Sequence, residues 1–198
     1  ISSQRNAFVL TSILVATLAA FSAGFLDAIA GGGGIIAMPT LLMLGLPVGE
    51  VLGTNKLQSS AGTSVATLTY AKQGAVIWPI AKIAIPLAAL GGLVGAFIVL
   101  RVPSDFLRPL VFVLVFGLAA YLIFRPRFGA HSTYSGIHGS FKWIVAASAV
   151  ALGFYDGFFG PGTGMFITYL LVRYLGLDFV RAAGTTKAIN LASNLAPL

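Results

Sequence analysis

An aspartate followed by a cluster of glycines occurs twice in this chain, each time within an apolar stretch. The first copy reads GFLDAIAGGGG and holds Asp27 and residues 31–34. The second reads GFYDGFFGPGTG and holds Asp156 and residues 160–164. Glycine destabilises helices, and a charge in apolar surroundings is costly. The repeated combination therefore predicts helices that are broken by glycine at two related positions.

A second block is also duplicated, further along each half. GTNK at residues 53–56 corresponds to GTTK at residues 184–187. The polar residues around these blocks recur at spacings i, i+4, i+7 and i+8, which fall on one face of a helix. The aligned sets are Asn55, Ser59, Gly62 and Thr63 in the first half, and Thr186, Asn190, Ser193 and Asn194 in the second. Two similar halves are typical of transporters built from repeats.

The composition indicates a membrane protein. Hydrophobic residues make up 58% of the 198 residues and charged residues only 9%, whereas soluble domains carry about 25% charged residues. The net charge of +7 fits loops that face anionic lipid, or a pathway for anions. The basic residues are scattered, which argues against binding of nucleic acid. There is no cysteine, so disulfides and thiolate metal sites are excluded, and we expect no cofactor.

Apolar stretches divide the chain into two expected repeats. The predicted spans are residues 7–30, 35–46, 83–100 and 106–124, together with the unusually polar stretch 48–72, and a new apolar run extends from 143 to 155. The stretch 35–46 is short, so it is a half-helix, a re-entrant segment or a tilted crossing. We expect a first transmembrane repeat at 1–124, a basic connecting loop at 125–142 and a second repeat at 143–198. The second repeat stops at the counterpart of Thr67, so we expect it to be incomplete at its C-terminal end.

The predicted fold is an all-α polytopic membrane protein with two pseudo-symmetric repeats. If the stretch 35–46 counts as a crossing, the first half has an odd number of crossings and the second half is inverted. If it is re-entrant, the two halves run parallel. We favour the inverted arrangement. The positive-inside rule places one set of loop residues in the cytoplasm: Lys72, Lys82, Arg125, Arg127 and Lys142. The histidines, His131 and His138, read as solvated loop residues.

The glycine breaks are the expected binding site. Broken helices at membrane depth persist only where they are buried or line a cavity, and the next half-helix can direct its positive end toward an anion. We predict that the breaks are non-helical and face each other, with Lys56 and Lys187 beside them. The predicted substrate-binding residues are Gly31, Gly32, Gly33, Gly34, Thr54, Asn55, Lys56, Gln58, Gly162, Thr163, Gly164, Thr185, Thr186, Lys187 and Asn190.

Asp27 and Asp156 are the expected carriers of a coupling proton. Because Tyr155 can donate a hydrogen bond in a polar pocket, we favour Asp156 as the member that binds and releases the proton. Structural alternatives stay open. The aspartates can pair with lysines, the glycines can allow tight helix crossings, and the polar face can hold helices together. Other motifs fail on spacing, including the dinucleotide fingerprint, the P-loop and metal-ligand clusters.

The two pairs of motifs resemble the TauE/SafE family of membrane transporters, the sulfite exporters. AGFLDAIAGGGG with LGTNKLQ, and GFYDGFFGPGTG with GTTKAINLASN, carry the resemblance. It implies a secondary permease or exporter in the cell membrane, the inner membrane of a bacterium, for small anions such as sulfite, organosulfonates or small organic acids. Its partners would be the substrate and the lipid bilayer, and a homodimer stays open. The alternative is a membrane structural or assembly subunit, and we expect no enzyme.

Overall fold

The structure is a computed structural model that describes residues 2–123, 132–134, 136, 139 and 141–198. Within these ranges the chain forms eight α-helices and no strand, so the predicted all-α fold is confirmed. The predicted loop histidines and the arginines at 125 and 127 lie outside the described residues. The helices are α1 (Ser2–Ala30), α2 (Gly34–Met43), α3 (Val48–Lys72), α4 (Trp78–Val99), α5 (Ser104–Ile123), α6 (Phe141–Phe158), α7 (Thr163–Leu175) and α8 (Phe179–Leu195).

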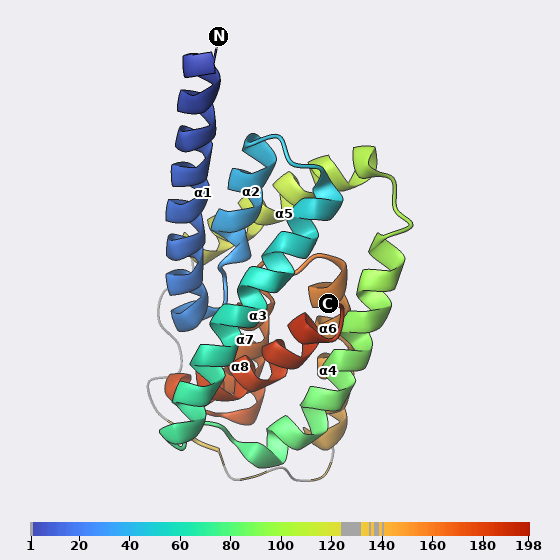
Figure 1. Cartoon of the computed structure of the whole chain (residues 1–198). Coiled ribbons are helices and arrows are strands. Elements are labelled where there is room, and N and C mark those ends of the chain that lie inside the picture. The colour runs from blue at the N-terminus through green and yellow to red at the C-terminus, as the bar shows by residue number, and fades with distance from the viewer. Residues whose placement is uncertain (1, 124–131, 135, 137–138, 140) are drawn as a thin grey trace.

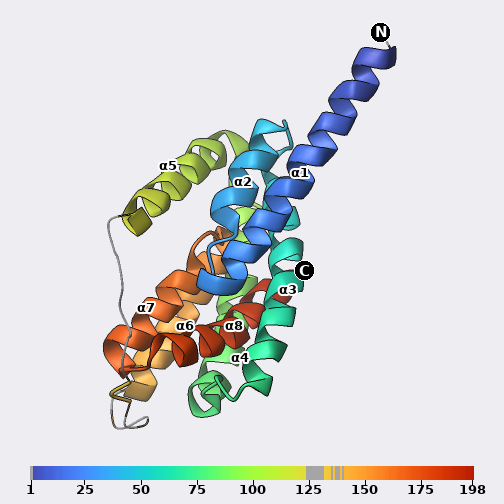
Figure 2. The same cartoon turned by 90° about the vertical axis from the view of Figure 1, so that its left-hand side faces the viewer.

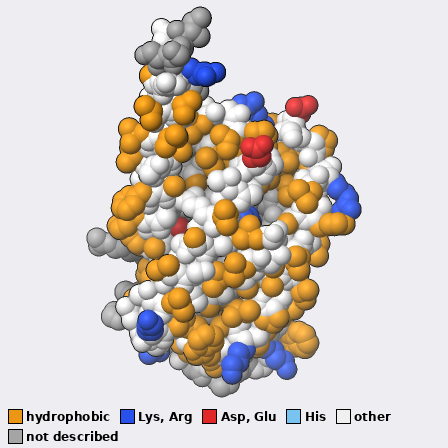
Figure 3. Space-filling view, in the orientation of Figure 1, with side chains coloured by type: hydrophobic (Ala, Val, Ile, Leu, Met, Phe, Trp, Pro, Cys, Tyr) orange, Lys and Arg blue, Asp and Glu red, His pale blue; other side chains and the backbone are white. Residues whose placement is uncertain are grey.

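The surface of the molecule is largely apolar. Hydrophobic side chains cover most of the face shown in Figure 3, while Lys and Arg gather toward its upper and lower ends. Phe21 on α1 is 75% exposed and Phe97 on α4 is 59% exposed. Within the described residues, two helical segments, Gln4–Ile29 and Trp78–Val99, are long and apolar enough to cross a membrane. An apolar belt between two charged ends is the pattern that a bilayer requires.

Two helical hairpins are built around the glycine clusters. After α1, Gly31 adopts a φ of +78°, and α2 turns back to pack along α1 (Figure 2). After α6, Gly160 and Gly162 adopt φ values of +101° and +78°, and α7 packs back on α6. Only glycine adopts such angles without strain. The helices are therefore broken where the sequence predicts.

The limits of the breaks differ slightly from the prediction. Residues 31–33 and 160–162 are non-helical, but Gly34 begins α2, and Thr163 and Gly164 begin α7. The first turns close at these positions: the N–H of Ile36 donates to the carbonyl of Gly33, and the N–H of Met165 donates to the carbonyl of Gly162, both at 3.0 Å. The stretch predicted at 35–46 is the ten-residue helix α2. Such a helix is about 15 Å long, half of the hydrocarbon core, so α2 is a half-helix.

The tightest helix crossing joins α4 and α6. A Cβ added to Gly91 would lie 2.7 Å from the backbone nitrogen of Phe154, and one added to Gly157 would lie 2.7 Å from the Cα of Gly92. Glycine therefore lets the two backbones touch, and Gly91 and Gly95 stand at the GxxxG spacing that is typical of such crossings. Helix α8 packs against both α3 and α4, and so connects the two halves of the chain.

The crossings also fix the directions of the helices. In Figure 1, α1 and α3 run downward from the N-terminal end, and α4 runs upward. The residue contacts show that α6 runs parallel to α4: Gly153 meets Ala88, and four residues further along both helices Gly157 meets Gly92. Helix α6 therefore runs opposite to α1, although both carry the same Gly-Phe-X-Asp motif.

Candidate functional site

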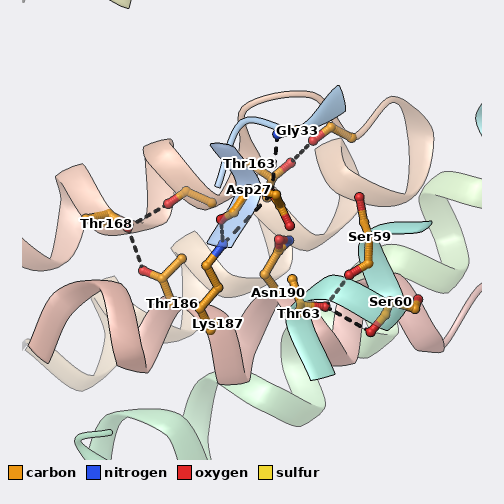
Figure 4. A network of polar contacts seen from close by, with 12 residues as sticks. Asp27, Gly33, Ser59, Ser60, Thr63, Thr163, Thr168, Thr186, Lys187 and Asn190 are labelled. Atoms are coloured by element: carbon orange, nitrogen blue, oxygen red, sulfur yellow. Dashed lines mark hydrogen bonds and ion pairs between the residues drawn. The ribbon is translucent and has the colours of Figure 1, made fainter. Parts of the chain in front are cut away.

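The first charged pair lies at the end of α1. Asp27 and Lys187 are both buried, although they come from α1 and α8. The Lys187 Nζ lies 3.9 Å from Asp27 Oδ1 and donates a hydrogen bond to the backbone carbonyl of Asp27. The backbone N–H of Gly33, just before α2, donates to the same carboxylate at 3.4 Å. Figure 4 shows these groups converging on Asp27. The carboxylate thus faces both a lysine and the positive end of α2.

In the second charged pair, the lysine comes from the first half of the chain and the aspartate from the second, the reverse of the first pair. Lys56 of α3 and Asp156 of α6 are 6% and 1% exposed, and the Lys56 Nζ lies 2.8 Å from Asp156 Oδ2. Lys56 also donates to the side-chain oxygen of Asn194 at 3.0 Å. Each lysine therefore pairs with the aspartate of the other half. Removing one partner of a buried pair costs about 3–5 kcal/mol because the other charge stays buried without compensation, so each charge depends on the other half for its partner.

The two glycine breaks meet at this place. A Cβ added to Gly31 would lie 2.6 Å from the Cα of Gly164, and one added to Gly164 would lie 2.7 Å from the Cα of Gly31. The predicted contact between the two clusters is therefore confirmed. Gly34 approaches Pro161, with only 3.3 Å between its added Cβ and the Cα of that residue. Replacing any of these glycines by a residue with a Cβ would therefore push the neighbouring backbone away.

Asn55 lies between the two breaks. Its side-chain oxygen would be 3.1 Å from a Cβ on Gly34, and its side-chain nitrogen 3.4 Å from one on Gly160. Within the described residues, Asn55 Oδ1 and Asn190 Nδ2 are buried without a hydrogen-bond partner. Leaving a buried polar atom unpaired costs about 1–3 kcal/mol. These two amides, one from each half, are therefore groups that a ligand or water molecule can satisfy.

Other predicted site residues form contacts inside the protein. The Thr168 hydroxyl donates to Thr186 at 3.0 Å, and Thr163 donates to the carbonyl of Gly160 at 2.8 Å. Gly162 precedes α7, and an added Cβ on Gly32 would lie 2.7 Å from the terminal methyl of Met165. These contacts fix the shape of the breaks.

Three of the predicted site residues face other parts of the molecule. Thr54 is exposed and, with Gln58, lines a pocket of about 260 Å³ beside α1 and α2. Gln58 donates to the carbonyl of Ala20 at 2.9 Å. Thr185 accepts a hydrogen bond from the backbone N–H of Ile77 at 2.9 Å and thereby anchors the start of α4. Consecutive residues of a helix point in different directions, so a shared block does not imply a shared site.

Sequence reasoning missed two contacts of the site. Asn194 belongs to the duplicated polar face, but its bond to Lys56 was not expected; its position seven residues after Lys187, on the same helix face, is the signal that points to it. The Tyr155 hydroxyl donates to the carbonyl of Pro161 at 2.9 Å, and so braces the second break. The tyrosine was expected to mark the pocket of Asp156, and no local sequence signal indicates the proline carbonyl.

A cavity reaches the second charged pair. Its volume is about 230 Å³, and it lies between α3, α4 and α5. Lys56 and Gly157 contribute to its wall, together with apolar residues such as Val99 and Leu107. Within the described part of the chain, no three Asp, Glu or His side chains come together in a way that could hold a metal ion. The chemistry available here is that of two lysines, two carboxylates and buried amides.

Buried charge pairs where two broken helices meet, inside an apolar surface, define a polytopic membrane protein of the transporter class. The chain belongs to the family described as sulfite exporter TauE/SafE, which its residues 16–198 match. This is a family of membrane transporters and not of enzymes, so the resemblance stated from the motifs is confirmed.

Several relatives carry the name of membrane transporters. The chain is 39% identical to "Probable membrane transporter protein ORF9" of Sinorhizobium sp, over 97% of this chain and 72% of the relative. It is 33% identical to "Probable membrane transporter protein YfcA" of Escherichia coli K12, over 98% of this chain and 72% of the relative. A "Probable membrane transporter protein" of Haemophilus influenzae is 37% identical over 89% and 68%. No solved structure matches the chain.

Proposed function

We propose that this protein is a secondary transporter of small anions such as sulfite, organosulfonates or small organic acids, in the cell membrane of a bacterium. The observation that carries the proposal is the reciprocal pairing of Lys56 with Asp156 and of Lys187 with Asp27 across the two halves. Charged residues at membrane depth are costly, and they usually mark the pathway of a substrate or an ion.

We further propose that residues 1–124 and 143–198 are inverted repeats joined by residues 125–142. The opposite directions of α1 and α6 support this arrangement, since both helices carry the same motif and both end at a glycine break. The returning half-helices α2 and α7 support it as well. Alternating access would then be a rocking of one repeat against the other around a fixed site.

The substrate site of this proposal lies beside the contact between the breaks. Its walls are residues 31–34, residues 162–164 and the inward faces of α3 and α8 around Asn55 and Asn190. Asn190 Nδ2 is a buried donor without a partner within the described residues, so it can donate to an oxygen of an oxyanion, whereas the unpaired Asn55 Oδ1 can only accept and suits a protonated group or a water molecule. Lys56 and Lys187 supply the positive charge, and Thr186 contributes a hydroxyl. Thr54, Gln58 and Thr185 act at a distance, by holding α3 and α8 in place.

Charge balance suggests how transport is coupled. The two lysines and two aspartates together are neutral, so a bound anion adds an uncompensated negative charge to a buried site. Protonation of one aspartate restores neutrality and frees its lysine to bind the anion. Asp156 is the favoured carrier, because the cavity beside Lys56 reaches its ion pair. Each anion would then move together with one proton.

The test is transport by purified protein in liposomes. Uptake and efflux are measured for sulfite, sulfate, organosulfonates and carboxylates, with and without a pH gradient. We expect at least one of these anions to accumulate when the gradient is imposed, and Asp156→Asn to abolish the response to pH. Asp105→Asn, at an exposed aspartate in the first turn of α5, is the matched control. Proton coupling that survives in both Asp27→Asn and Asp156→Asn would exclude these carboxylates as carriers.

A membrane scaffold remains the competing function, since several hydroxyl side chains of α3 bond to their own helix. Thr63, Ser64 and Thr69 all donate to backbone carbonyls of α3. A folded protein that moves none of the tested anions would favour the scaffold and refute the transporter.

A further inference from the structure

A long groove runs between α1 and α3 on the surface of the first half. Its volume is about 630 Å³. Small residues form its floor and large apolar side chains its rims: Phe21 is 75% exposed and Val65 is 68% exposed. A Cβ added to Gly24 or Gly62 would meet no atom within 4 Å. The groove therefore has room for a further element between the two helices.

The sequence repeat shows what the corresponding groove of the second half contains. Aligning the two Gly-Phe-X-Asp motifs places α1 on α6, and aligning the two Gly-Thr-X-Lys motifs places α3 on α8. Helix α4 lies between α6 and α8 and packs tightly against both. Its glycines meet the backbone of α6 at Val150, Gly153, Phe154, Gly157 and Phe158.

The residues aligned with these contacts all line the open groove. The counterparts on α1 are Phe21, Gly24, Phe25, Ala28 and Ile29, and each of them belongs to the groove wall. On α8, the Cα of Ser193 would lie 3.2 Å from a Cβ on Gly92 of α4. Its counterpart on α3 is Gly62, which also lines the groove. The same surface is thus covered by a helix in one half and open in the other.

We infer that the groove between α1 and α3 is the docking site for a membrane helix with the chemistry of α4. Such a helix is apolar, runs parallel to α1 and carries small residues where it crosses Gly24 and Ala28. Small residues are required because the floor of the groove lets backbones approach closely. The inference depends on the sequence repeat and on the groove that α4 fills, and it holds whether or not the protein transports anions.

Cysteine cross-linking tests the docking, and the absence of native cysteine makes each cross-link specific. The probe is a synthetic peptide with the sequence of residues 78–99, reconstituted with the whole protein in liposomes. Because Gly157 meets Gly92 and Gly153 meets Ala88, the aligned partners are known. We expect Ala28→Cys to link to a peptide with Gly92→Cys, and Gly24→Cys to one with Ala88→Cys. Ala28→Cys should not link to the Ala88→Cys peptide, as an antiparallel helix would require.

A second experiment fills the groove with a side chain and asks whether the peptide can still dock. Gly62→Ile should abolish the cross-link of Ala28→Cys without unfolding the protein, because its side chain enters open space. Gly117→Ile on α5, where an added Cβ also meets nothing within 4 Å, should leave the cross-link intact. The inference is overturned if the peptide does not link, or if Gly62→Ile leaves the link unchanged. Disulfides between two copies of Ala28→Cys, in place of the peptide link, would also overturn it by assigning the groove to a second copy.

Discussion

The ion pair between Lys56 and Asp156 is the contact whose removal is expected to affect stability most clearly. Both side chains are almost completely buried, and 2.8 Å separate Lys56 Nζ from Asp156 Oδ2. Lys56→Gln leaves the carboxylate buried without its lysine. We expect this change to lower the free energy of unfolding by about 3–5 kcal/mol, the usual cost of removing one partner of a buried pair. Asp156→Asn should cost a similar amount, because it isolates the lysine.

The double variant Lys56→Gln/Asp156→Asn completes a cycle that isolates the interaction energy between the two side chains from their separate contacts with the rest of the protein. It leaves two neutral amides that can hydrogen bond, so no buried charge remains. Replacing both members of the pair by uncharged groups removes the penalty of an unpaired buried charge, which is the main cost in each single variant. We therefore expect the double variant to be more stable than either single variant. The coupling energy of the cycle should be about 3 kcal/mol or more.

A surface pair of the same protein supplies the control. Arg181 Nε lies 3.6 Å from Asp178 Oδ2, and the Arg181 side chain is 53% exposed. The control cycle uses Arg181→Gln and Asp178→Asn, because asparagine keeps the N-terminal cap of α8 that Asp178 provides. Exposed pairs contribute about 0.2–1 kcal/mol, so a much smaller coupling is expected.

The assay is unfolding in mixed detergent micelles, followed by circular dichroism and the fluorescence of Trp78 and Trp143. The reasoning is refuted if the two cycles give equal coupling energies, or if both single variants of the buried pair cost less than about 1 kcal/mol. Either result would mean that water screens Lys56 and Asp156 in the folded protein, and that the pair does not hold the two halves together.

Three further predictions concern backbone contacts. Gly31→Ala should destabilise more than Gly45→Ala, since both glycines have positive φ but only Gly31 meets another backbone; the thermal unfolding of both variants checks this, and equal shifts would contradict it. Gly157→Leu should prevent folding or cost more than the 1–3 kcal/mol typical of overpacking, whereas Gly117→Leu should be tolerated, as measured by folded yield and unfolding. Thr185→Val should cost about 1–3 kcal/mol by removing the acceptor of the Ile77 N–H, with anion affinity unchanged, and an altered affinity would place Thr185 in the site.

The helix breaks could be predicted because glycine and aspartate leave a clear signal in an apolar sequence. The positive φ of Gly31 and Gly162 shows why those positions need glycine. The contact between the two breaks also followed from the duplication. Which lysine meets which aspartate could not be predicted, since pairing within one half and pairing across halves leave the same residues in the sequence. Only the packing of α8 against α3 decides it.

The limits of the site were harder to predict than its centre. Thr54 and Thr185 stand next to residues that face the breaks, and motif membership alone brought them into the prediction. In the structure Thr54 is exposed and Thr185 anchors the loop before α4. Helix periodicity places neighbours about 100° apart, so it separates Thr54 from Asn55, but the direction of the face depends on tertiary packing. The small residues of the α4–α6 crossing do leave a signal in the sequence, since Gly91 and Gly95 stand at GxxxG spacing.

The crossed pairing limits how the two halves can move. If the halves rock against each other, both ion pairs span the moving boundary, so both must lengthen or exchange partners together. Separating two buried pairs without compensation would cost several kcal/mol, which is comparable with the whole folding stability of a typical domain. An anion that binds the lysines, with a proton that neutralises an aspartate, removes this cost at the moment of movement. A protein that has bound only the anion or only the proton would carry an uncompensated buried charge, so only the fully loaded protein moves readily, which is the property that prevents a symporter from leaking.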